Sequence, residues 1–125
     1  MPADSADHTK PDDIGAVKVR LADLGKLVQA SSHLPGGVRS ALIRSLDELS
    51  ATLAMAEKAS LTDKERIVHA AETATRLIAK PQPEWPLLER SIKSLSEAAH
   101  ALRDREPRVV EVVSGIAVAL ADIGI

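Results

Sequence analysis

The chain has 125 residues, with 16 lysines and arginines against 18 aspartates and glutamates, and it contains no cysteine, tyrosine or phenylalanine. This length suits one domain with an aliphatic core. The lack of cysteine excludes a disulfide framework, a thiolate nucleophile and a cysteine-based zinc site. The nearly balanced charge provides no basic field that would attract nucleic acid.

The first twelve residues are polar and contain Pro2 and Pro11. We expect residues 1–12 to form a flexible tail, followed by a single helical domain over residues 13–125. The tail lacks the apolar stretch of a secretory signal, and we therefore expect a cytoplasmic protein.

Five segments repeat apolar residues at alternating spacings of three and four, which is typical of one buried seam along an α-helix. They cover about residues 13–31, 37–58, 62–79, 84–106 and 107–125, and short breaks rich in proline or glycine separate most of them. Short connections place neighbouring helices antiparallel. The predicted fold is an all-α antiparallel bundle of four to five helices. The seams are Ile14, Val17, Leu21, Leu24 and Val28; Leu42, Leu46, Leu49, Leu53 and Ala56; Ile67, Ala71, Ala74 and Ile78; Leu88, Ile92, Leu95, Ala99 and Leu102; and Val109, Val113, Ile116, Leu120 and Ile123.

Two local signals refine these boundaries. Thr62 and Glu65 have the spacing of a capping box at the start of the third helix. Pro107 interrupts a seam that otherwise continues from the fourth segment into the fifth, and a proline inside a helix costs about 3 kcal/mol. We predict a break or a sharp kink there rather than one long helix.

Two motifs resemble half of a carboxylate-bridged metal site: Glu97-x-x-His100 and, reversed, His69-x-x-Glu72. Both lie away from the apolar seams of their helices, so we expect solvated outer faces rather than inward-pointing ligands. We predict no catalytic, cofactor-binding or metal-ligating residue. The short arginine cluster at positions 103, 105 and 108 alternates with acidic residues, and we expect no nucleic-acid binding.

The segment from Val109 to Ile125 is the most apolar part of the chain. Glu111, Ser114 and Asp122 are its only polar side chains, and they share an arc of roughly 80–100° on a helix. The two carboxylates argue against a membrane span. The helix is either the central helix of a monomer or one side of a contact with another chain.

Under the second alternative, the candidate interface consists of Val110, Val112, Ile116, Leu120, Ile123 and Trp85. Trp85 is the only aromatic residue, and tryptophan is enriched at interface hot spots, although it could instead cover the end of the bundle.

Glu106-Pro107, followed by an apolar helix closing on Leu-Ala-Asp-Ile-Gly-Ile at 120–125, resembles a family of short bacterial helical proteins classed as a domain of unknown function. The resemblance covers about residues 84–125. It implies a helical hairpin followed by a proline-initiated helix, and it implies no activity or cofactor.

We expect a non-enzymatic module for protein–protein interaction or self-association through the last helix, either as a homodimer or with an unknown protein partner. A small-ligand carrier is an alternative, and so is a metal-dependent enzyme that uses Glu97 and His100.

Overall fold

Five α-helices make up the computed structural model, which describes residues 9–82 and 84–124. No strand occurs in these two ranges, so the predicted all-α class is confirmed. None of the helices described is long and apolar enough to cross a lipid bilayer. The helices are α1 (Thr9–Ala30), α2 (Gly36–Ala54), α3 (Leu61–Ile78), α4 (Trp85–His100) and α5 (Pro107–Gly124).

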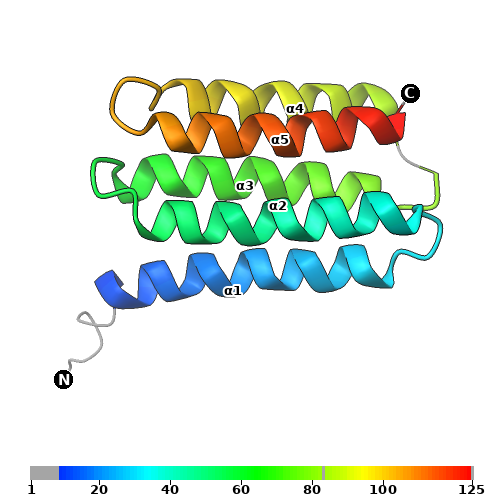
Figure 1. The fold of residues 1–125 in the computed structure, drawn as a ribbon, viewed down its shortest axis with the longest axis horizontal. Coiled ribbons are helices and arrows are strands. Elements are labelled where there is room, and N and C mark those ends of the chain that lie inside the picture. The colour runs from blue at the N-terminus through cyan, green and yellow to red at the C-terminus, as the bar shows by residue number, and fades with distance from the viewer. Residues whose placement is uncertain (1–8, 83, 125) are drawn as a thin grey trace.

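Successive helices run antiparallel and form a bundle (Figure 1). Helix α1 lies along one edge and packs on α2 and α3, whereas α4 and α5 lie together along the opposite edge. Helix α4 packs on α3, and α5 packs on α2 and α4. These contacts close the five helices into a ring, with one apolar core inside it.

The predicted seams form this core. Every seam residue of α2 and α3 is buried, as are Leu88, Leu95 and Ala99 of α4. Ile92 and Ile123 are partly buried against the same core. The side chain of Ile14 lies outside the described part of the chain. Burial of a seam at the 3–4 spacing is therefore what holds the five helices together.

Helix boundaries differ from the prediction at three places, one of which is the end of α4 at His100 rather than near residue 106. Helix α1 begins at Thr9 rather than near residue 13, and residues 1–8 of the expected tail lie outside the described residues. Helix α2 ends at Ala54 rather than near Lys58. The seam residue Ala56 is still buried, but it belongs to the connection to α3.

The predicted capping box at Thr62 and Glu65 is wrong, because the box lies two residues earlier. The Ser60 hydroxyl accepts a hydrogen bond from the Asp63 amide at 3.1 Å, and the Asp63 carboxylate accepts one from the Ser60 amide at 3.1 Å. These bonds lower the pKa of Asp63. Glu65 is instead bound by Arg20 of α1 and does not cap the helix.

The predicted break at Pro107 is confirmed. Helix α4 ends at His100, residues 101–105 form turns, and Pro107 is the first residue of α5, where its missing N–H has no intrahelical acceptor. The carboxylate of Glu106 accepts a hydrogen bond from the Lys58 amide at 2.8 Å. This bond joins the α4–α5 connection to the α2–α3 connection at one end of the bundle.

Candidate functional site

The structure places three of the candidate interface residues inside the chain's own core. Val112, Ile116 and Leu120 are at most 5 % exposed. The reason is that α2 and α4 flank α5 in the ring, so its apolar seam faces the bundle interior. Val110 and Ile123 are partly buried against the same core. These residues are therefore covered by the chain itself.

Trp85, the remaining candidate, is the first residue of α4 and is 40 % exposed. Leu87, two residues further along, is exposed to a similar extent. The indole is therefore partly exposed to solvent at this end of the bundle.

The outer face of α5, defined here as Arg108, Glu111, Gly115, Val118 and Asp122, is exposed along its whole length. These residues follow spacings of three, four, three and four, so they share one side of the helix. Val118 is 60 % exposed and lies between Gly115 and Asp122 on this face. Arg108 is bound to Glu111 at 3.0 Å.

A groove of about 370 Å³ runs between this outer face and α2. Small residues line most of it: Gly37, Ala41 and Ser45 from α2, and Gly115 and Ala119 from α5. Val38 of α2 and Val118 and Asp122 of α5 complete the lining. Small side chains let another helix approach closely, so the groove and the outer face together form a surface that can receive a helix.

The packing within the single chain does not explain why residue 115 is a glycine. The backbone φ of Gly115 is not positive, and a Cβ placed on it would meet no atom of another helix within 4 Å. Neither backbone geometry nor internal packing requires a glycine in the middle of this helix. Glycine there weakens the helix by about 0.5–1 kcal/mol relative to alanine.

A second groove, of about 500 Å³, lies between α3 and α4. Arg66, His69 and Thr73 line it from α3, and Arg90 and Glu97 line it from α4. It thus brings one residue from each metal-like motif to the same hollow. No group of three or more histidine, aspartate or glutamate side chains within the described ranges could hold a metal ion. Exposed and half-buried side chains line most of both grooves, and neither groove is an enclosed apolar cavity.

The expectation that both motifs lie on solvated outer faces is correct for His69, Glu97 and His100, which are exposed, but wrong for Glu72. The Glu72 side chain is only 15 % exposed, because Arg20 of α1 covers it.

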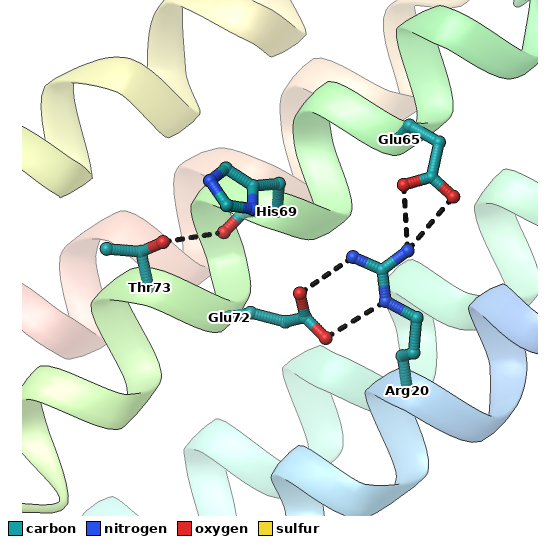
Figure 2. A network of polar contacts seen from close by, with 5 residues as sticks. All are labelled: Arg20, Glu65, His69, Glu72 and Thr73. Carbon is teal, nitrogen blue, oxygen red and sulfur yellow. Dashed lines mark hydrogen bonds and ion pairs between the residues drawn. The ribbon is translucent and has the colours of Figure 1, made fainter.

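The contact between Arg20 and α3 is a fork of ion pairs (Figure 2). The guanidinium donates to both oxygens of Glu72 at 2.7 and 3.0 Å. Its third nitrogen donates to both oxygens of Glu65 at 2.7 and 2.9 Å. The hydrogen bonds from Arg20 lower the pKa of Glu72, and the two carboxylates raise the pKa of Arg20. The fork holds α1 against α3, so its role is to stabilise the fold.

Comparisons of the chain with family models, with curated proteins and with solved structures found no match. The resemblance of residues 84–125 to the bacterial helical family therefore stays a prediction.

Proposed function

We propose that the protein is a non-enzymatic interaction module that self-associates through the outer face of α5 and the adjoining α2–α5 groove. The observation that carries this proposal is the exposure of Val118 beside a groove of small residues. The seam of α5 is not part of this surface, because it serves the core of the monomer.

Self-complementarity favours a second copy of the chain as the partner. The surface offers a protruding valine and, next to it, a hollow over Gly115 and Ala119. A two-fold axis pairs each valine with the hollow of the other copy, because an isologous interface uses the same patch twice. Fully burying a valine contributes about 1.5–3 kcal/mol, so two partly exposed valines provide a modest driving force.

Sedimentation equilibrium over a wide concentration range tests the proposal. We expect the mass of the wild-type protein to rise from 13.3 kDa towards twice that value as concentration increases. Val118→Asp should keep the chain monomeric, because it places a charge within the contact.

Val19→Asp is the matched control, because Val19 of α1 is 59 % exposed and Val118 is 60 % exposed. The control should associate like the wild type. A wild-type chain that stays monomeric at every concentration, or that only binds an unrelated protein, contradicts self-association. Equal behaviour of the two variants contradicts the assignment of the surface.

We also propose a cytoplasmic location, which the lack of cysteine in the chain supports. Imaging of a fluorescent fusion in the source cell tests it, and secretion of the fusion would contradict it.

A further inference from the structure

We infer that the two copies pair with their α5 helices antiparallel and crossing at Gly115, so that Arg108 of each copy lies against Asp122 of the other. This inference rests on the proposed function and adds the orientation and contacts of the partner.

The glycine identifies the crossing point. Gly115 is the middle residue of the outer face of α5, and no atom of its own chain occupies the space beside it. Two helices approach most closely where both present glycine, because no Cβ separates their backbones. A contact centred on Gly115 therefore uses the feature of α5 that the monomer does not explain.

The charges identify the orientation. Arg108 lies seven residues before Gly115 and Asp122 lies seven residues after it, which places each about 10 Å from the crossing point along the helix. An antiparallel pair brings each arginine opposite an aspartate. A parallel pair would instead oppose arginine to arginine and aspartate to aspartate, which is unfavourable.

The remaining residues of the face fit the antiparallel arrangement. Val118 lies three residues beyond the crossing point, about 4–5 Å along the axis, which places it between Gly115 and Glu111 of the second copy. Arg108 already holds Glu111 of its own chain at 3.0 Å. Its planar guanidinium has donors left for Asp122 of the second copy and can neutralise both carboxylates.

Charge exchange at the two ends of the face tests the orientation by sedimentation equilibrium. Arg108→Asp and Asp122→Arg each create two like-charge contacts in an antiparallel pair, and we expect each to raise the dissociation constant about tenfold. The double variant Arg108→Asp/Asp122→Arg restores opposite charges at both contacts and should associate like the wild type. In a parallel pair, the double variant would retain like charges, so a failure to recover overturns the inference.

Disulfide crosslinking provides a second measurement, because the natural chain has no cysteine. A mixture of Arg108→Cys and Asp122→Cys chains should form a crosslinked heterodimer under mild oxidation. Arg108→Cys alone should not crosslink, since its two thiols would lie about 20 Å apart along the axis. Crosslinking of Arg108→Cys to itself contradicts the antiparallel orientation but not self-association. A monomeric wild-type chain contradicts self-association itself.

Discussion

Replacing Gly115 by alanine is expected to have opposite effects on the single chain and on the pair. In the single chain, the new methyl group enters open space, since no atom of another helix lies within 4 Å of the Cβ position. The substitution removes the helix penalty of glycine and should stabilise the monomer by about 0.5–1 kcal/mol. For a domain of this size, that corresponds to a rise in Tm of roughly 2–4 °C.

In the pair, the same methyl group lies at the point where the two helices cross. It pushes the backbones apart and should weaken association. Thermal unfolding followed by circular dichroism, on protein dilute enough to be monomeric, measures the first effect. Sedimentation equilibrium at high concentration measures the second.

Gly25→Ala is the matched control. The Cβ placed on Gly25 in α1 meets only Ile43 Cγ2, at 4.0 Å, which is an ordinary contact. This variant should also stabilise the monomer and should leave association unchanged. A Gly115→Ala chain that melts earlier than the wild type, or that associates as tightly, would refute the reasoning.

Three further predictions concern the monomer. Leu120→Ala should lower the free energy of unfolding by about 2–5 kcal/mol in denaturant titrations, because Leu120 is fully buried, whereas Val118→Ala should change it by at most ~0.5 kcal/mol. Thr75→Val should raise the free energy of unfolding by about 1 kcal/mol, since the buried Thr75 hydroxyl makes no hydrogen bond with any described residue. A loss of stability in this variant would contradict the prediction. Glu72→Gln should lower the free energy of unfolding by about 1 kcal/mol at neutral pH. Because Arg20 lowers the pKa of Glu72 in the folded state, the carboxylate stabilises the fold above its ordinary pKa of 4.5, and this contribution disappears as the pH falls through the folded-state pKa. A Glu72→Gln effect that is equally large in acid would contradict this sign.

The sequence was sufficient to predict the core and the main chain break. Seams such as Leu42, Leu46, Leu49 and Leu53 are visible because burial imposes the helical period on apolar residues. The break at Pro107 was predictable because proline removes a backbone donor and clashes with the preceding turn. Both signals are local, so one sequence is enough to detect them.

The features that the sequence did not reveal depend on contacts between helices. The pairing of Glu72 with Arg20 joins residues 52 positions apart, and no local pattern specifies it. Three of the candidate interface residues, Ile116, Leu120 and Ile123, belong to the seam of α5, and the apolar residues of this helix could serve either the core or a second chain. The contact between α2 and α5 closes the ring of helices and buries the seam of α5 in the core. Val118 is left as the exposed large apolar side chain of that helix.

Methyl NMR of the natural chain during dilution tests self-association through the outer face of α5 most directly, because it requires no substitution. The Val118 methyl resonances should shift with concentration, whereas those of the equally exposed Val19 should stay fixed. Val118 resonances that do not change over the whole concentration range, or that change in step with those of Val19, would contradict the proposal.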